Sequence, residues 1–267
     1  TFILFPTFIK SIYSGVTCLF FTFWLSANHA ALCQSKPLNY QIEAREFLNA
    51  IRNKENTDLY IKIFNDCTVD QLNGQISTDQ QKLAFWINIY NAYIQVILSK
   101  NPEKYNDRST FFKEKQIKIG GQLFSFEDIE HGILRRSQHP FFLGYITRWF
   151  PEKTEKMLRV SNRNWRIHFA LNCGAKSCPP VAIYDVDRIE SQLDLSTKNY
   201  LQKFSAYDPA SKTAYVTSLF SWFRGDFGGL AGIKNILIHH NIIPDINVRL
   251  KTAEYDWTLD LGNFVDL

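Results

Sequence analysis

The residues best suited to chemistry lie within residues 165–180, which read WRIHFALNCGAKSCPP. This stretch holds His168 and two cysteines, Cys173 and Cys178, five positions apart. A thiol beside an imidazole can ionise to the nucleophilic thiolate, and a third group must then orient the imidazole. The stretch therefore predicts a thiol-dependent hydrolase or acyl transferase in which Cys178 is the nucleophile.

Two histidines are candidates for the base, His168 and His131. On an extended strand His168 and Cys173 point to opposite faces, so His168 pairs more naturally with Cys178 once residues 174–177 fold back. The backbone amides of this loop would also be available as oxyanion donors. Glu130, Asp226 or Asp256 is expected to orient the histidine, and Asn172 or Asn91 to assist. The residues expected to line the substrate pocket are Asn88, Asn91, Asn172, Cys173, Ser177 and Asp256.

The same residues leave two other interpretations open. Two thiolates and two imidazoles, from Cys173, Cys178, His168 and His131, form a set that zinc accepts, but one cysteine pair with a four-residue spacer is a weak zinc motif. The cysteines would otherwise form a disulfide in a non-enzymatic binding module, with His168 a buried core residue. The thiol enzyme needs neither a metal nor another cofactor, and no phosphate-cradling glycine-rich loop is found.

The composition is that of a globular protein with a sizeable core. Of the 267 residues, 45% are hydrophobic, 15% aromatic and 21% charged. Lys and Arg total 30 against 26 Asp and Glu, and no basic run is longer than the pair Arg135 and Arg136. Nucleic-acid binding therefore has little support, and a small-molecule or peptide substrate is expected.

The first thirty residues predict an exported protein. Lys10 precedes a charge-free run over residues 11–25, and the small residues that follow are typical of a signal peptide cleaved after Ala30. The run is shorter than the roughly 20 apolar residues of a spanning helix, so no stable membrane span is expected after cleavage, although an uncleaved anchor remains an alternative. Residues 31–267 are then expected to form a single domain in the periplasm or outside the cell. Its four cysteines, for which disulfides are the ordinary expectation, are Cys33, Cys67, Cys173 and Cys178.

The elements that must position these residues are predicted to be mostly helical. The patterns favour helices over residues 39–51, 79–100, 125–136, 184–204 and 220–240, the last broken at Gly228 and Gly229 so that Asp226 lies in a turn or at a helix end. Strands are expected in a hairpin over 116–125, around His168, over 213–219 and over 253–260. The aromatic residues 141–150 are expected to cover the core. The fold class is α+β, a mostly helical single domain with a small, largely antiparallel sheet.

The segment over residues 79–100 is the expected core helix, because it is apolar around most of its circumference. Thr78 or Ser77 is positioned to cap its start. Asn88, Asn91 and Gln95 lie on one stripe of this helix, and buried amides need hydrogen-bond partners. They are expected either to bind neighbouring backbone or to line a pocket.

Five ordered blocks of the sequence together resemble a known family. LAFWINIYNAYI, FEDIEHGILR, RIHFALNCGAKSCPPV, LFSWFRGDFG and AEYDWTLD are similar to the signature blocks of the domain of unknown function 547 family, from about Gln80 to the C-terminus. The resemblance implies a domain with no established substrate that occurs in exported bacterial proteins and in plant and animal proteins. Because similar members occur in reducing compartments, it also implies that the cysteine pair is not merely an extracellular disulfide. The positions carried over by motif are Asn88, Asn91, Glu130, His131, His168, Cys173, Ser177, Cys178, Asp226 and Asp256.

Overall fold

The structure, a computed structural model, describes residues 38–267. Within it, Asn39–Leu267 form one compact unit. The predicted signal peptide over residues 1–30 lies outside the described residues. None of the helices in the described part is long and apolar enough to cross a membrane.

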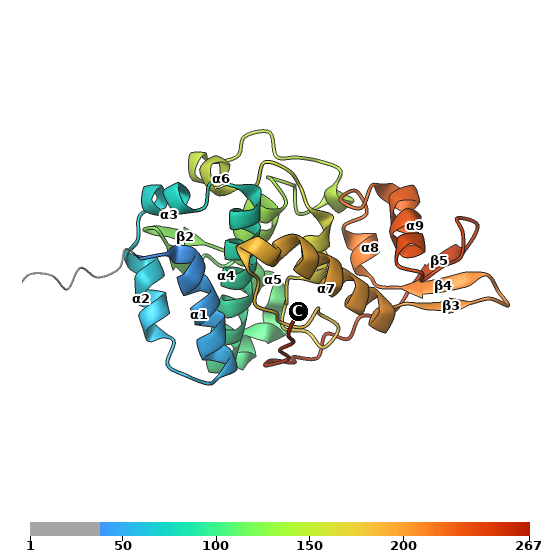
Figure 1. The fold of residues 1–267 in the computed structure, drawn as a ribbon, viewed down its shortest axis with the longest axis horizontal. Coiled ribbons are helices and arrows are strands. Elements are labelled where there is room, and N and C mark those ends of the chain that lie inside the picture. The colour runs from blue at the N-terminus through green and yellow to red at the C-terminus, as the bar shows by residue number, and fades with distance from the viewer. Residues whose placement is uncertain (1–37) are drawn as a thin grey trace, which may run out of the picture. The chain divides into compact units, whose positions relative to one another are not determined.

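Helices dominate the chain from its first described element (Figure 1). The first elements are α1 (Tyr40–Arg52), α2 (Asp58–Asp66), α3 (Val69–Gln75), α4 (Asp79–Lys100), the 3-10 helix η1 (Pro102–Asp107) and α5 (Arg108–Lys113). The middle of the chain holds β1 (Ile117–Ile119), β2 (Gln122–Phe124), the π-helix η2 (Asp128–Leu134), the 3-10 helix η3 (Phe142–Gly144), α6 (Lys153–Leu158) and the 3-10 helix η4 (Trp165–Phe169). The last elements are the 3-10 helix η5 (Val186–Arg188), α7 (Ile189–Phe204), β3 (Ala206–Asp208), β4 (Thr213–Val216), α8 (Leu219–Trp222), α9 (Gly229–His239) and β5 (Arg249–Thr252).

Helix α4 is the centre of the main hydrophobic core, as its composition predicts. Almost all of its side chains are buried, and α1 packs along it (Figure 1). Thr78 begins the helix through a capping box, in which its hydroxyl accepts from Gln81 N at 3.2 Å and its own N–H donates to the Gln81 side chain at 3.0 Å. This cap satisfies backbone N–H groups at the start of a helix whose interior is shielded from water.

The strands form two separate small sheets. β1 and β2 make the predicted antiparallel hairpin, with Ile117 opposite Phe124. The second sheet has the order β3-β4-β5, antiparallel between β3 and β4 and parallel between β4 and β5. The α+β class, mostly helical with small and largely antiparallel sheets, is therefore confirmed.

Two of the predicted strands are wrong. Residues 165–169 around His168 form the 3-10 helix η4, whose N-cap Asn164 accepts a hydrogen bond from Arg166 N at 3.1 Å. Residues 253–260 form no regular strand, and the antiparallel bridge between Ala175 and Leu259 is their only ladder contact within the described residues. The apolar run around His168 is too short for periodicity to identify its backbone conformation, whereas residues 253–260 alternate between half-buried and exposed positions but have no neighbouring strand in the described part of the chain to pair with beyond that bridge.

The aromatic loop over residues 141–150 also differs from the expectation, because it does not cover the core. Trp149 is 85% exposed and Phe150 is 92% exposed. The loop instead lies against the turn after α8, where Gly225 N donates to Leu143 O at 2.7 Å. Gly144 has a φ of 85°, and a Cβ atom there would lie 2.4 Å from an Asp226 oxygen, so this contact requires glycine.

The C-terminal tail runs from the second sheet back to the helices around α4. After β5 the chain returns to the helical part, and its end lies beside α7 (Figure 1). Val181 N donates to Asn263 O at 2.8 Å, and Arg188 donates to Leu267 O at 3.0 Å. The tail thus passes along the loop that contains the two cysteines and forms one wall of the site.

Candidate active site

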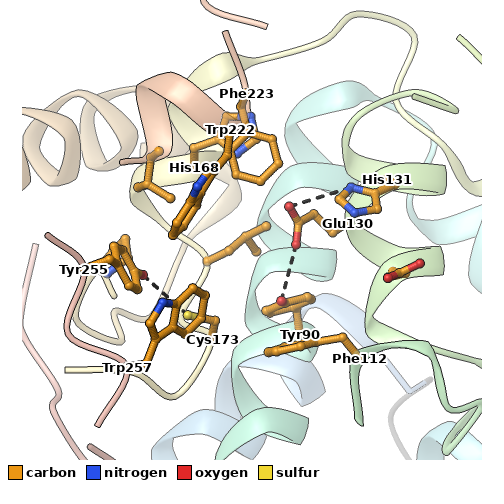
Figure 2. Close-up of a pocket in the computed structure, with 14 residues that line it drawn as sticks. Tyr90, Phe112, Glu130, His131, His168, Cys173, Trp222, Phe223, Tyr255 and Trp257 are labelled. Atoms are coloured by element: carbon orange, nitrogen blue, oxygen red, sulfur yellow. Dashed lines mark hydrogen bonds and ion pairs between the residues drawn. The ribbon is translucent and has the colours of Figure 1, made fainter. Parts of the chain in front are cut away.

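A cavity of about 210 Å³ opens where the helical core, the cysteine loop and the C-terminal tail meet. Figure 2 shows Glu130, His131 and Tyr90 on one side of it, with Cys173, Tyr255 and Trp257 on the other. Most of its wall is aromatic or aliphatic. The full lining is Tyr90, Phe112, Glu127, Glu130, His131, His168, Leu171, Cys173, Pro179, Leu219, Trp222, Phe223, Tyr255 and Trp257.

The π-helix η2 presents Glu130 and His131 to the cavity. Ser125 and Asp128 fix its start reciprocally, since Asp128 N donates to Ser125 Oγ at 3.0 Å and Ser125 N donates to Asp128 Oδ2 at 2.8 Å. The wide winding of the helix is marked by the bond from Arg135 N to Glu130 O at 2.8 Å, five residues back. Such π-turns recur at functional sites because they change which side chains share a face.

Glu130 is a carboxyl group at the cavity wall whose side chain is 17% exposed and has few partners. Tyr90 donates its hydroxyl to Oε2 at 3.4 Å, and His131 Nδ1 lies 3.7 Å from Oε1. Burial raises the pKa of Glu130 to about 7, despite the opposing charge of Arg135. At neutral pH this side chain is therefore present in both its acid and its carboxylate form.

His168 lies on η4 and is held by Asp226 from the turn after α8. Its Nε2 is 2.8 Å from Asp226 Oδ2, and its ring stacks on Phe223 with 3.9 Å between the ring centres. Burial lowers the pKa of His168 to about 4, against the opposing effect of Asp226. His168 is therefore neutral at pH 7, with Nε2 as the protonated nitrogen that faces the carboxylate.

Asp226 remains charged although it is buried. Burial would raise its pKa, but hydrogen bonds from His168 and Arg135 outweigh that effect and lower it to about 2. Arg135 Nε donates to Oδ2 at 2.6 Å, and Arg163 Nη1 lies 3.2 Å from Oδ1. The carboxylate is thus paired on both oxygens, which compensates its loss of hydration.

His131 is a poor candidate for the base. Arg135 Nη1 lies 2.7 Å from its Nδ1, and because a guanidinium can only donate, Nδ1 must be the unprotonated acceptor. Burial and the charge of Arg135 lower the pKa of His131 well below its usual range. The nitrogen that would take a proton is therefore already occupied.

Cys173 and Cys178 form a disulfide. The sulfur of Cys178 therefore carries no thiol in this structure, and Cys173 rather than Cys178 lines the cavity. Among the described residues the free cysteine is Cys67, which is buried in the core. The thiolate nucleophile predicted from the sequence is thus not available in this oxidised form.

Asn88 and Asn91 do not line the cavity, contrary to the expectation for the pocket. Asn88 donates to Tyr184 O at 2.8 Å and accepts from Tyr184 N at 2.9 Å. Asn91 donates to Ala170 O at 3.0 Å and accepts from Asn172 N at 2.8 Å. Both amides therefore bind the backbone of segments that cross α4, which is the first of the two roles expected for them.

Three further residues expected in the pocket instead hold the cysteine loop. Asn172 donates to Pro179 O at 2.7 Å and accepts from Gly174 N at 3.0 Å. Ser177 Oγ accepts from Asp256 N at 2.8 Å, while the Asp256 carboxylate lies 3.6 Å from the exposed Lys176. None of the three lines the cavity: Asn172 bonds the loop to itself, and Ser177 and Asp256 join the loop to the C-terminal tail.

The fold does not bring together the four residues expected for a zinc site. No group of three or more His, Cys, Asp or Glu side chains within residues 38–267 is arranged to hold a metal ion. His168 is paired with Asp226, and both sulfurs are joined to each other.

Sequence reasoning missed the aromatic walls and Arg135. Four aromatic residues of the wall lie inside the family-like blocks quoted above, but an aromatic residue in such a block is equally typical of a core position; the four are Tyr90, Trp222, Tyr255 and Trp257. In the sequence Arg135 stands out only as half of a basic pair with Arg136, yet its side chain is 1% exposed. Only the pairing with Asp226, 91 residues away, explains that burial.

Fold and site together define an α+β domain with an aromatic cavity that contains an aspartate-held histidine and a carboxyl group of raised pKa. Residues 75–201 match the family described as "Protein of unknown function, DUF547", and the chain carries a domain of this family. The match includes the first three of the five blocks, and so η2, η4 and both cysteines. No curated protein and no solved structure matches the chain.

Proposed function

We propose that this protein is a hydrolase or acyl transferase that acts by acid–base chemistry on a small substrate. The observation that carries the proposal is the contact of 2.8 Å between His168 Nε2 and Asp226 Oδ2 at the wall of the cavity. A buried carboxylate that holds one nitrogen of an imidazole leaves the other nitrogen as the proton acceptor. No partner for Nδ1 occurs within residues 38–267.

His168 acts as the general base in this proposal. Nδ1 takes a proton from a water molecule or a substrate hydroxyl, which then attacks an acyl carbon, and Asp226 stabilises the imidazolium that forms. Because burial keeps His168 neutral at pH 7, the base is in its active form before substrate binds. The negative charge of Asp226 stabilises the imidazolium of His168 in the transition state, whereas the neutral imidazole of the ground state does not require it.

Glu130 acts as the general acid. Its pKa of about 7 provides a protonated carboxyl group at neutral pH, and it can give that proton to the leaving group. Tyr90, which donates to Oε2, has its own pKa raised by burial and so remains a hydrogen-bond donor. Glu130 and His168 come from different elements, η2 and η4, and both line the same cavity.

The cavity walls indicate the class of substrate. Trp222 and Trp257 stack at 5.5 Å between ring centres, and Phe112 and Leu219 add apolar surface. Such a wall favours an acyl or alcohol part that is aromatic or aliphatic and uncharged. A peptide would enter only with one apolar side chain.

The thiol-dependent form of this chemistry would first need reduction of the Cys173–Cys178 disulfide. The second candidate function is a binding module without catalysis. The disulfide favours this function because it crosslinks the cysteine loop at the cavity wall and leaves neither cysteine as a thiol. In that case the aromatic cavity would hold a ligand without converting it.

A screen of ethyl esters with acetyl, butyryl and benzoyl groups, monitored by the release of ethanol, tests the proposal, because the ethoxide leaving group needs the proton that Glu130 would supply. We expect turnover that is lowered at least about 100-fold in His168→Gln and in Glu130→Gln, since positioned acids and bases contribute factors of that size. His139→Gln is the matched control, because His139 lies outside the cavity. Equal rates in the wild type and in His168→Gln would contradict the proposal. Saturable binding of these esters without turnover would support the binding module.

A further inference from the structure

The Cys173–Cys178 disulfide is asymmetric in its surroundings. Cys173 is partly exposed and lines the cavity, whereas Cys178 is 2% exposed and does not. A molecule in the cavity can therefore reach the sulfur of Cys173 but not that of Cys178.

Three hydrogen-bond donors converge on the buried sulfur. Cys178 Sγ accepts from Cys173 N at 3.1 Å, from Ala175 N at 3.3 Å and from the Tyr255 hydroxyl at 3.2 Å. The Tyr255 oxygen is 3.5 Å from Cys173 Sγ as well. Donors on a sulfur atom stabilise its thiolate, as they do at low-pKa cysteines. Burial raises the pKa of Tyr255, so its hydroxyl keeps the proton that it donates.

We propose that this disulfide is a thiol-exchange site, at which a low-molecular-weight thiol of the glutathione class becomes attached to Cys173. The thiol loses its proton to solvent, and its thiolate attacks Cys173 Sγ from the cavity. A new S–S bond forms between the incoming sulfur and Cys173, the Cys173–Cys178 bond breaks, and its electron pair leaves on Cys178. The resulting Cys178 thiolate is held by Cys173 N, Ala175 N and Tyr255.

The loop does not need the disulfide to keep its shape. The two cysteines are five residues apart, and a short closed loop gains least from a crosslink in the chain-entropy account. Lys176 N donates to Thr258 O at 2.8 Å, and Asp260 N donates to Gly174 O at 2.8 Å, so the C-terminal tail holds the loop independently. Opening the bond therefore leaves the three donors in place for the thiolate.

Exchange with glutathione tests the proposal on the full chain in its native state. The protein is incubated with reduced glutathione at neutral pH, quenched with acid, and its peptides are mapped by mass spectrometry. We expect glutathione on Cys173 and a free thiol at Cys178. The Tyr255→Phe variant should open about tenfold more slowly, because it loses one hydrogen bond to the leaving sulfur while keeping its aromatic contacts with Trp222 and Trp257.

Tyr93→Phe is the matched control, since Tyr93 is also buried and its hydroxyl has no partner within the described residues. Its opening rate should equal that of the wild type. A disulfide that glutathione opens only in urea, glutathione attached to Cys178 instead of Cys173, or equal rates in Tyr255→Phe and Tyr93→Phe would each overturn the proposal. Exchange is measured without any ester substrate, so its failure is separate from a failure of the acid–base chemistry.

Discussion

His168 donates from Nε2 to Asp226 Oδ2 over 2.8 Å, and the same oxygen accepts from Arg135 Nε at 2.6 Å. These three side chains come from η4, from the turn after α8 and from the end of η2. One carboxylate therefore determines the tautomer of the candidate base and neutralises a guanidinium that is 1% exposed. Asp226 thus links the chemistry of the site to the stability of the domain.

Replacement of Asp226 by Asn should destabilise the protein strongly. The change leaves Arg135 buried without its counter-charge, and breaking a buried ion pair in this way costs about 3–5 kcal/mol. Urea unfolding monitored by tryptophan fluorescence measures the change in free energy of unfolding. Asp194→Asn is the control: Asp194 pairs with Arg166 but is 67% exposed, and its loss should cost less than about 1 kcal/mol. Similar losses in the two variants would argue against a central role for Asp226.

The raised pKa of Glu130 predicts a pH-dependent stability. Because its pKa is about 7 in the folded protein and 4.5 in the unfolded chain, the folded state binds more protons between these values. This stabilising contribution is complete below pH 4.5 and is lost as the pH rises through 7. Between pH 5 and pH 8 the free energy of unfolding of the wild type should fall by about 2 to 3 kcal/mol relative to that of Glu130→Gln. A difference that stays constant over this range would show that Glu130 is already ionised at pH 5.

The same two groups predict the pH dependence of ester hydrolysis. The base, His168, must be neutral, which requires a pH above its pKa of about 4, and the acid, Glu130, must be protonated, which requires a pH below about 7. We therefore expect a bell-shaped profile of kcat/KM with limbs near these two values. Glu130→Gln should remove the alkaline limb along with most of the rate. An alkaline limb that persists in this variant would assign it to another group.

Asn91→Ala tests the structural role of the amide stripe on α4. The change removes the partners of Ala170 O and Asn172 N, both of which belong to buried residues. Each unsatisfied group costs about 1–3 kcal/mol, so the two together should lower the free energy of unfolding, measured in urea, by about 2–6 kcal/mol.

Asn49→Ala on α1 is the matched control. Asn49 accepts from Arg52 at 3.1 Å and donates to Glu46 at 3.3 Å, and both contacts are reachable by water. Its replacement should therefore change the free energy of unfolding by less than about 1 kcal/mol. If Asn91→Ala changed the free energy of unfolding as little as Asn49→Ala, the Asn91 amide would not be what holds α4 to the segment before the cysteine loop.

The sequence alone determined the elements that depend on interactions between neighbouring residues. The start of α4 follows from Thr78 and Gln81, which cap it within one turn, and the β1–β2 hairpin follows from two alternating runs around Gly120 and Gly121. The residue types of the site were equally visible, since His168, Glu130 and Asp226 lie in the motif blocks. These features depend on contacts between residues close in sequence, which a pattern can encode.

The tertiary structure decided which of those residues share a site. The sequence offered three carboxylates to orient the histidine and left the two cysteines between a free thiol, a zinc site and a disulfide. The fold selects Asp226, which reaches the imidazole of His168 from 58 residues away, and joins Cys178 to Cys173. The sequence also offered the amides of α4 to a pocket, whereas the backbone of residues 170–184 occupies them. A buried polar group must satisfy its hydrogen bonds with whatever segment packs against it, and only the folded chain determines which segment that is.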